Sequence, residues 1–294
     1  MRLLVTGGRG KVGRSVIAAA QAAGHEVIST DIVPASYGPP ANPGEPPYIR
    51  ADLSDYGQVT GVLQKVKPDV VVHSAGIPSP SQDPAAVVFA TNTLANFNVA
   101  EAVSRSEVAR LVYISSETVP GFMAAERSFL PDYVPVDEEH PARPQDAYGL
   151  SKYVGEVICD ALARRTDTAV VSVRPSVVLS ADQYSGFVSR LQESSREAVR
   201  PFPNIWSYVD VEDLADLILL AAAGDTTGHE VVYAAQPDNM LGRPLGELLH
   251  AAYGDEGPPL RDLARPDASG IAIDKARRLF GWDPKRSWRD HLPS

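Results

Sequence analysis

Short apolar runs rich in β-branched residues alternate along the chain with longer stretches whose apolar positions recur at helical spacing. This alternation is typical of β–α–β units, in which successive strands lie parallel in one sheet. We therefore expect an α/β fold with a doubly wound parallel sheet of about seven strands. The predicted strands cover residues 2–6, 26–30, 48–50, 69–73, 111–115, 169–174 and 230–234.

Helical periodicity occupies the intervals between these strands. Ser54 and Asp210 are expected to cap the helices that follow them, and Asp83 stands before a proline that would begin a third. Two proline-rich intervals, 36–47 and 120–144, predict irregular structure, and the second has the length of a lid or binding loop. The predicted helices cover residues 11–23, 54–65, 84–106, 146–164 and 211–223.

Composition and charge narrow the class of protein. The chain has 294 residues, with 27 basic and 37 acidic side chains, and its net charge is −10. Such an acidic chain is unsuited to binding nucleic acid or a membrane surface through basic patches. The single cysteine, Cys159, excludes an internal disulfide, and the six scattered histidines predict no metal site. We expect a cytoplasmic protein, because no apolar run reaches about 18 residues and a strand begins at Arg2 without a signal peptide.

A glycine-rich turn follows the first predicted strand. It reads Thr6-Gly7-Gly8-Arg9-Gly10-Lys11-Val12-Gly13 and leads into the first helix. Glycines at Gly7, Gly10 and Gly13 would allow a tight turn, the close approach of a pyrophosphate to the backbone, and close packing of the helix on the sheet. The unsatisfied N–H groups of the helix N-terminus would bind the phosphates. The turn therefore predicts a dinucleotide site.

Asp31 supports this interpretation and bears on the choice of cofactor. It stands at the end of the second strand, where a carboxylate can accept hydrogen bonds from both hydroxyls of the adenosine ribose and would repel a 2′-phosphate. This favours NAD over NADP. Arg9 leaves the choice open, because its guanidinium could pair with a 2′-phosphate or could neutralise Asp31.

Tyr148 and Lys152 are the first candidates for catalytic chemistry. They are four residues apart on a predicted helix, so they share a face. The strand before that helix ends in Ser115 and Ser116, and ligands of open α/β sheets bind at the carboxyl ends of the strands. This position, rather than the Tyr-x-x-x-Lys spacing alone, indicates an active site.

With these motifs the sequence resembles the extended short-chain dehydrogenase/reductase family, also called the NAD-dependent epimerase/dehydratase family. The resemblance covers essentially the whole chain. The matching segments are TGGRGKVG (6–13), Asp31, Asp52-Leu53, HSAG (73–76), Asn92, YISSETVPG (113–121), YGLSK (148–152), RPSVV (174–178), WSYVDVEDLAD (206–216) and IDKARRLFGWDP (273–284).

The resemblance implies a domain organisation and a set of cofactor contacts. A Rossmann-type NAD-binding domain would cover residues 1–174, with 206–235 returning to it. Residues 175–205 and 236–294 would form a small C-terminal substrate-binding subdomain. The residues implied to contact NAD are Gly7, Arg9, Gly10, Lys11, Val12, Gly13, Asp31, Asp52, Leu53, Ser74, Ala75, Gly76, Asn92, Ser115, Tyr148, Lys152, Pro175 and Val177.

The family's catalytic residues fall on Ser116, Tyr148 and Lys152. Tyr148 would exchange the proton of the substrate hydroxyl, and its free phenol, with a pKa of about 10, is a poor base at neutral pH. Lys152 and the positive nicotinamide are expected to lower that pKa. Ser116 would hold the substrate oxygen, since it lies four residues before Pro120, where the family's usual Val-Tyr-Gly has its tyrosine. Ser115 would then face the sheet core or the cofactor.

The substrate region departs from that of the family's sugar 4,6-dehydratases. These carry two acidic residues after the catalytic Ser/Thr, whereas this chain has only Glu117 before Thr118, which disfavours dehydration. Glu117 is either a substrate contact or a solvated loop carboxylate, and Ser176 is a further candidate for substrate contact. Residues 179–205 are few and lack a glycine-rich nucleotide platform, which favours a small or unactivated substrate. Arg190 could bind a diphosphate or lie on a solvated helix face.

Three functions remain open from the sequence. The first is an NAD-dependent oxidoreductase acting at a secondary alcohol or ketone of a sugar, a sugar acid or a similar small hydroxy compound. The second is a nucleotide-sugar epimerase similar to UDP-glucose 4-epimerase. The third is a catalytically silent NAD sensor, which the intact Ser/Tyr/Lys set disfavours.

Family members commonly form homodimers by pairing two long helices of each subunit into a four-helix bundle. In this chain the two helices are 84–106 and 146–164. They carry more apolar residues than one face needs for packing on the sheet, so burial between subunits is expected. The apolar and small positions concerned are Val87, Val88, Phe89, Thr91, Leu94, Ala95, Phe97, Val99, Val103, Val154, Val157, Ile158, Ala161 and Leu162.

Overall fold

A seven-stranded parallel sheet forms the centre of the molecule, in the order β3-β2-β1-β4-β5-β6-β9. The computed structural model describes residues 1–34, 44–195 and 198–291. The predicted α/β class and all seven predicted strands are confirmed. The chain leaves β1 toward one edge and later returns toward the other, so a topological switch point lies between β1 and β4. The strands are β1 (Arg2–Thr6), β2 (Glu26–Asp31), β3 (Tyr48–Arg50), β4 (Val70–His73), β5 (Arg110–Ile114), β6 (Ala169–Pro175) and β9 (His229–Ala234).

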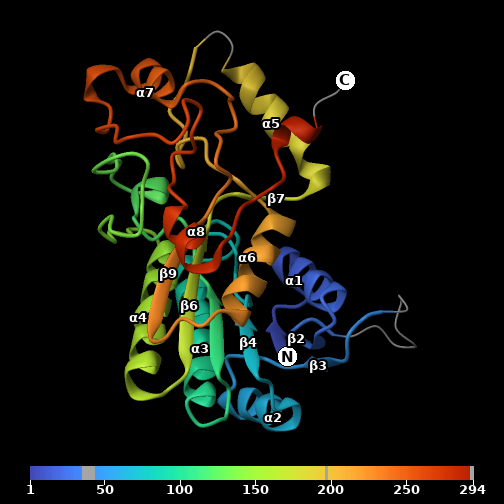
Figure 1. Ribbon diagram of the computed structural model, residues 1–294. Helices are drawn as coiled ribbons and strands as arrows, with labels where there is room; N and C mark the ends of the chain where they lie inside the picture. The colour runs from blue at the N-terminus through green and yellow to red at the C-terminus, as the bar shows by residue number, and fades with distance from the viewer. Residues whose placement is uncertain (35–43, 196–197, 292–294) are drawn as a thin grey trace.

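Helices cover both faces of the sheet, because successive strand side chains point to opposite faces. Leu3 and Val5 pack into the apolar layer beneath α1 and α6, whereas Leu4 packs into the layer beneath α2, α3 and α4. Figure 1 shows these helices flanking the strands. The helices are α1 (Lys11–Ala22), α2 (Tyr56–Val66), α3 (Ala85–Val103), α4 (Ala147–Arg165) and α6 (Val211–Ala223).

Two predicted helix caps are wrong, and one is confirmed. The residue that caps α2 is Asp55, whose side chain accepts from the Gln58 N–H, while the Ser54 hydroxyl donates to Asp52. Helix α3 begins after Pro84 and has no side-chain cap, so Asp83 does not serve as one. Asp210 caps α6 as predicted. In α2, Asp55 thus satisfies the backbone N–H group that Ser54, one residue earlier, was expected to bind.

The segments between β6 and α6, and those after β9, lie at the carboxyl end of the sheet, above the strands in Figure 1. None of their elements was predicted from the sequence; α5 is a regular helix of 14 residues, and the others are shorter. The interval 120–144 packs against the segment after β9. Val134 in this interval forms a β-bridge with Leu260, and Val136 forms one with Ile271. The elements are β7 (Val178–Leu179), α5 (Ala181–Ser194), β8 (Val209–Asp210), α7 (Leu245–Tyr253), α8 (Asp274–Phe280) and 3₁₀ turns at Phe122–Ala124, Gly254–Glu256 and Trp288–His291.

Two negative findings apply to the described ranges. None of their helices is both long and apolar enough to cross a membrane. They also contain no group of three or more His, Cys, Asp or Glu side chains arranged to hold a metal ion. Most of the proline-rich interval 36–47 lies outside the described residues.

Helices α3 and α4 pack against each other and leave apolar side chains on their outer surface. Of the apolar positions named for these two helices, Val88, Val99 and Leu162 are buried in the core. The exposed apolar residues of the two helices are Val87, Leu94, Phe97, Leu150, Tyr153 and Val157.

Candidate active site

The glycine-rich turn joins β1 to α1 and has the form that the sequence predicted. Gly7 adopts a positive φ of 67°, and a Cβ there would lie 2.6 Å from the Ala75 backbone nitrogen. A Cβ at Gly13 would lie 2.2 Å from the Gly7 carbonyl oxygen. Helix α1 begins after Gly10 without a side-chain cap and without an acidic residue in its first turn. Its N-terminal N–H groups are therefore left for an anion, so the turn fits a bound pyrophosphate.

Two cavities meet at this turn and share Gly7, Gly10, Ser74, Gly76 and Ile77. The larger, of about 520 Å³, lies over the ends of β4, β5 and β6, and the smaller, of about 240 Å³, extends toward the end of β2. Two connected spaces on either side of a phosphate-binding turn fit the two halves of a dinucleotide. The predicted residues lining the larger cavity are Gly7, Gly10, Lys11, Val12, Gly13, Ser74, Gly76, Ser115, Ser116, Glu117, Tyr148, Lys152, Pro175, Ser176 and Val177.

The smaller cavity contains the predicted adenosine contacts Asp31, Asp52, Leu53 and Ala75. The Asp31 carboxylate accepts from the backbone N–H groups of Arg9 at 3.0 Å and Val33 at 3.2 Å. These two bonds hold the carboxylate at the end of β2, where the sequence expected it to meet the ribose.

The Arg9 side chain takes a position that the sequence did not predict. Its guanidinium lies over the Tyr48 ring, 4.5 Å from the centroid, and it does not line the cavity of Asp31. No ion pair joins Arg9 to Asp31 in the described part of the chain. Arg9 therefore does not neutralise the carboxylate through a direct contact.

Ser116, Tyr148 and Lys152 line one wall of the larger cavity. Asp146 caps α4 by accepting from the Tyr148 and Gly149 N–H groups, which sets Tyr148 in the first turn of the helix. Burial raises the pKa of Tyr148 to about 12, and a hydrogen bond with Ser116 opposes part of that rise. The sequence predicted a lowered pKa from Lys152 and the nicotinamide together. The protein side chains alone act in the opposite direction, because burial of the phenol has the larger effect.

Lys152 lies one helical turn after Tyr148, and its Nζ is 5.6 Å from the centroid of the Tyr148 ring. Its ammonium donates to the Ile114 carbonyl oxygen at 2.9 Å. Burial lowers the pKa of Lys152 to about 8, and Glu156 opposes that shift. A pKa of about 8 leaves most of Lys152 charged at neutral pH, so a positive charge remains beside the phenol.

Ser115 and Ser116 have different surroundings. Ser115 lines the larger cavity, and its hydroxyl donates to the buried Glu156 carboxylate at 2.6 Å. Arg174 binds the same Glu156 carboxylate with two bonds of 2.8 Å, and both residues of this ion pair are about 5% exposed. Tyr233 accepts a further bond from Arg174. This buried network ties β5, α4 and β6 together.

Glu117 is buried rather than solvated, with 7% of its surface exposed. Its carboxyl accepts from the Ser176 hydroxyl at 2.7 Å and is contacted by the Asn204 amide at 3.3 and 3.4 Å. Burial raises the pKa of Glu117 to about 8. The alternative of a solvated loop carboxylate is therefore wrong.

Besides Arg9, two predicted contacts lie outside both cavities. Asn92 bonds the backbone of Ile77 through both ends of its amide and also donates to Ser151, so it shapes the loop after β4. Arg190 lies exposed on α5 and lines neither cavity. Lys11 does line the larger cavity, and its ammonium bonds the Val178 carbonyl and the Gln183 side chain.

The sequence interpretation missed several residues of the cavity walls. The loop after β4 contributes Ile77, Pro78, Ser79 and Pro80, and β5 and the turn after it contribute Ile114 and Thr118. The rule that ligands bind at the carboxyl ends of parallel strands could have found them. Asn204 carried no such signal, because it reaches Glu117 from 87 residues further along the chain.

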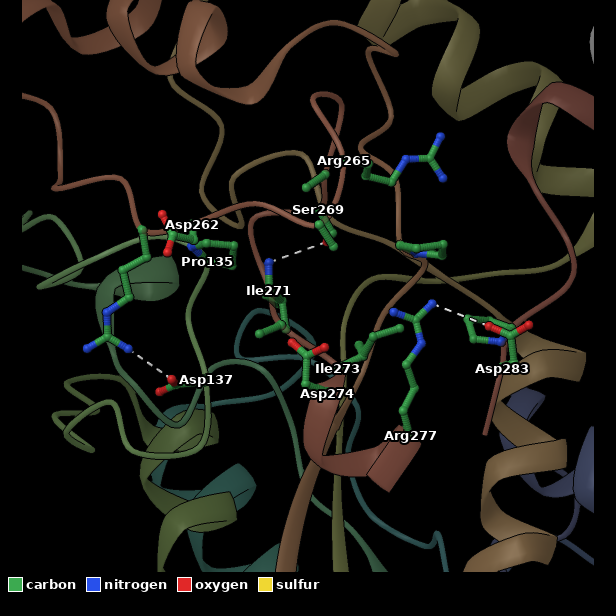
Figure 2. Close-up of a pocket in the computed structure, with 16 residues that line it drawn as sticks. Pro135, Asp137, Asp262, Arg265, Ser269, Ile271, Ile273, Asp274, Arg277 and Asp283 are labelled. Atoms are coloured by element: carbon green, nitrogen blue, oxygen red, sulfur yellow. Dashed lines mark hydrogen bonds and ion pairs between the residues drawn. The ribbon is translucent and has the colours of Figure 1, made fainter. Parts of the chain in front are cut away.

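A separate groove of about 580 Å³ lies on the C-terminal segment and on the loop before α4 (Figure 2). Two ion pairs join side chains that line it, Arg261 with Asp137 and Arg277 with Asp283. It shares no lining residue with the cavity of Tyr148. The groove is therefore distinct from the candidate active site.

The sheet and the two cavities that meet at the glycine-rich turn define a Rossmann-type protein, with Ser116, Tyr148 and Lys152 lining the larger cavity. Comparison with known proteins identifies the family within this class. Residues 3–234 match the model of the NAD dependent epimerase/dehydratase family, and the chain belongs to that family. The family includes NAD-dependent epimerases and dehydrogenases, so this chain belongs to a family of enzymes.

Relatives of both reaction types are similar to this chain over nearly their whole length. The dTDP-6-deoxy-L-talose 4-dehydrogenase (NAD(P)(+)) of Kitasatospora kifunensis is 27% identical, over 98% of this chain and 92% of its own. The UDP-glucose 4-epimerase of Mycolicibacterium smegmatis is 26% identical, over 97% of this chain and 94% of its own.

A solved structure of the Bordetella bronchiseptica enzyme WbmG, in complex with NAD and UDP, has a similar fold. It aligns with a TM-score of 0.68 and 26% identity, and the alignment covers 98% of this chain and 90% of that one. The fold therefore accommodates NAD in a relative of comparable length.

Proposed function

We propose that the protein is an NAD-dependent oxidoreductase that transfers hydride at a secondary alcohol or ketone of a sugar or a similar hydroxy compound. The observation that carries this proposal is that Ser116, Tyr148 and Lys152 share one cavity with the glycine-rich turn. A silent NAD sensor would not need a buried lysine and a half-buried tyrosine at that wall.

Each of the three side chains has a separate task in this proposal. Bound NAD would accept or return the hydride. Tyr148, protonated at neutral pH because its pKa is about 12, would donate its proton to a ketone oxygen in the reducing direction. In the oxidising direction, the nearby Lys152 ammonium favours the phenolate that takes the hydroxyl proton. Ser116, whose Oγ accepts from Thr118, would hold the substrate oxygen beside the phenol.

A panel assay tests this function. The purified protein is incubated with NAD and a range of sugars, sugar acids, nucleotide sugars and small secondary alcohols, and NADH is followed by absorbance. We expect net NADH from at least one compound. If no compound yields NADH or an altered product, the proposed function is wrong.

An epimerase is the second candidate, and the similarity to the Mycolicibacterium smegmatis UDP-glucose 4-epimerase over 97% of this chain supports it. An epimerase removes and returns hydride at the same carbon, so NADH does not accumulate. Chromatography of the same reactions distinguishes the two candidates, since an epimerase yields an isomer of the added sugar without net NADH.

We predict that NAD binds at least about tenfold more tightly than NADP, a difference of about 1.4 kcal/mol. The Asp31 carboxylate, held by the Arg9 and Val33 N–H groups, would meet the 2′-phosphate of NADP as a like charge. Titration calorimetry measures both affinities. Asp31→Asn should narrow the ratio, and an equal or greater affinity of the unmodified protein for NADP would contradict the assignment.

We also propose that residues 175–205 and 236–294 form the substrate-binding subdomain. Ser176 and Asn204 support it, because both belong to the first of these ranges and both contact Glu117 at the cavity wall. Nucleotide-sugar or smaller substrates would enter between this subdomain and the sheet.

A homodimer is the proposed assembly, formed through the exposed stripe of α3 and α4. Phe97 and Val157 are each 48% exposed, and apolar stripes of this kind on paired helices are commonly buried between subunits. Light scattering should give twice the chain mass of 31.5 kDa. Phe97→Glu with Val157→Glu should yield monomers, whereas Leu220→Glu, on α6, should not. A monomer at micromolar concentration in the unmodified protein would contradict the proposal.

A further inference from the structure

Lys11 joins the glycine-rich turn to the segment that follows β6. It is the first residue of α1, and it lines the larger cavity. Its ammonium donates to the Val178 carbonyl oxygen in β7 at 2.9 Å and to the Gln183 side chain in α5 at 2.6 Å. These two partners lie 167 and 172 residues further along the chain. A side chain of the dinucleotide turn therefore holds the start of the proposed substrate-binding subdomain.

Gln183 is the residue through which this bond reaches α5. It is the third residue of that helix, and its side-chain oxygen also accepts from the backbone N–H of Ser180 at 3.2 Å and from the Ser180 hydroxyl at 3.1 Å. Lys11 thus bonds the same oxygen that closes the first turn of α5. Gln183 lines neither cavity. We therefore expect an effect of Gln183 on a ligand in the cavities to pass through Lys11.

The charge of Lys11 has no carboxylate partner at this end of α1. None of the ion pairs in the described part of the chain includes Lys11, and the first turn of α1 has no acidic residue. Burial lowers the pKa of Lys11, and Asp182, which is beyond ion-pair distance, opposes that shift. The helix dipole disfavours a cation at a helix N-terminus and favours an anion there. The position therefore suits a lysine that meets a bound anion.

We propose that Lys11 is a positioning residue that couples NAD binding to the placement of α5, by donating one N–H to the cofactor pyrophosphate while the other two hold Val178 and Gln183. An ammonium has three N–H groups, which is the number that this arrangement needs. The inference rests on the proposed function, because it assumes that NAD occupies the glycine-rich turn. Such coupling is reciprocal, so bound NAD holds α5 in place and the bond to α5 strengthens NAD binding.

Titration calorimetry with NAD alone tests the coupling and requires no substrate. Lys11→Met keeps an apolar stem and removes the charge, so it should weaken NAD binding at least about tenfold. Gln183→Leu removes the acceptor on α5 and should weaken NAD binding at least about twofold, although Gln183 lies outside both cavities. The double variant should bind NAD as tightly as Lys11→Met does, because the effect of Gln183 requires the ammonium.

Ser180→Ala is the matched control for Gln183→Leu. It removes a hydroxyl that donates to the same Gln183 oxygen, and so weakens the first turn of α5, but it leaves the bond between Lys11 and Gln183 in place. The NAD affinity of this variant should equal that of the unmodified protein. A role of Gln183 that was only structural would instead affect both variants alike.

Hydrogen exchange measures the coupling in the other direction and begins with the unmodified protein. Saturating NAD should slow amide exchange in α5, Ala181–Ser194, because the pyrophosphate fixes the ammonium that holds this helix. In Lys11→Met, NAD at a concentration that saturates the variant should leave the exchange of α5 unchanged. Each protein is compared with and without NAD, so a general loosening of α5 in the variant does not affect the result.

Several results would overturn the inference while NAD still binds. These are an unchanged NAD affinity in Lys11→Met, independent effects of the two substitutions in the double variant, and exchange in α5 that NAD leaves unchanged in the unmodified protein. Faster exchange with NAD would also overturn it, because the ammonium would then leave Gln183 when it meets the pyrophosphate. Absence of NAD binding to the unmodified protein would overturn the proposed function instead.

Discussion

Replacing Tyr148 by phenylalanine should lower turnover at least about a hundredfold, because the variant keeps the ring and loses the group that exchanges the proton. Binding of NAD should persist, since the glycine-rich turn and Asp31 are unchanged. Turnover is measured with whichever compound of the panel reacts, and NAD binding is measured by titration calorimetry.

Tyr153→Phe is the matched control for this variant. Tyr153 lies on the same helix, five residues later, with 37% of its surface exposed, and it lines neither cavity. It should retain full activity. A Tyr148→Phe enzyme as active as the unmodified protein would remove Tyr148 from the mechanism.

A large effect on the stability of the fold is expected when the buried ion pair of Glu156 and Arg174 is broken. Arg174→Met removes both bonds to the carboxylate and leaves Glu156 buried without a cation. Breaking a buried pair in this way lowers the free energy of unfolding by ~3–5 kcal/mol. The melting temperature should fall by roughly 5–15 °C, as measured by calorimetry or circular dichroism.

The double variant Glu156→Leu with Arg174→Met is the control, because it removes the unpaired charge together with its partner. It should recover most of the stability lost in Arg174→Met. A single variant that melts within about 2 °C of the unmodified protein would show that the pair contributes little to stability.

Much of the fold could be predicted because the relevant signals are local. Strands and helices of the sheet follow from apolar periodicity over a few residues, and every strand predicted from it is present in the structure. The glycine-rich turn and the Tyr148–Lys152 spacing are likewise set by neighbouring residues. Even here, local chemistry left a choice, since both Ser54 and Asp55 can cap a helix and only the folded turn shows which one does.

The side-chain environment of the site depends on residues that are distant along the chain. Asn204 and Ser176 enclose Glu117 from 87 and 59 residues away, and this enclosure makes a loop carboxylate into a buried one. Burial raises the pKa of Tyr148, an effect of the folded environment that the prediction from sequence did not include.

The sequence by itself determined the parallel sheet, the glycine-rich turn and the placement of Tyr148 and Lys152 on one face of a helix. These follow from chain periodicity and spacing, which do not depend on distant contacts. Only the tertiary structure decided that Arg9 stacks on Tyr48, that Asn92 shapes a loop, and that Arg190 stays outside the cavities. A side chain's partners are decided when separate elements pack together, because hydrogen bonding and desolvation depend on atoms that the local sequence does not contain.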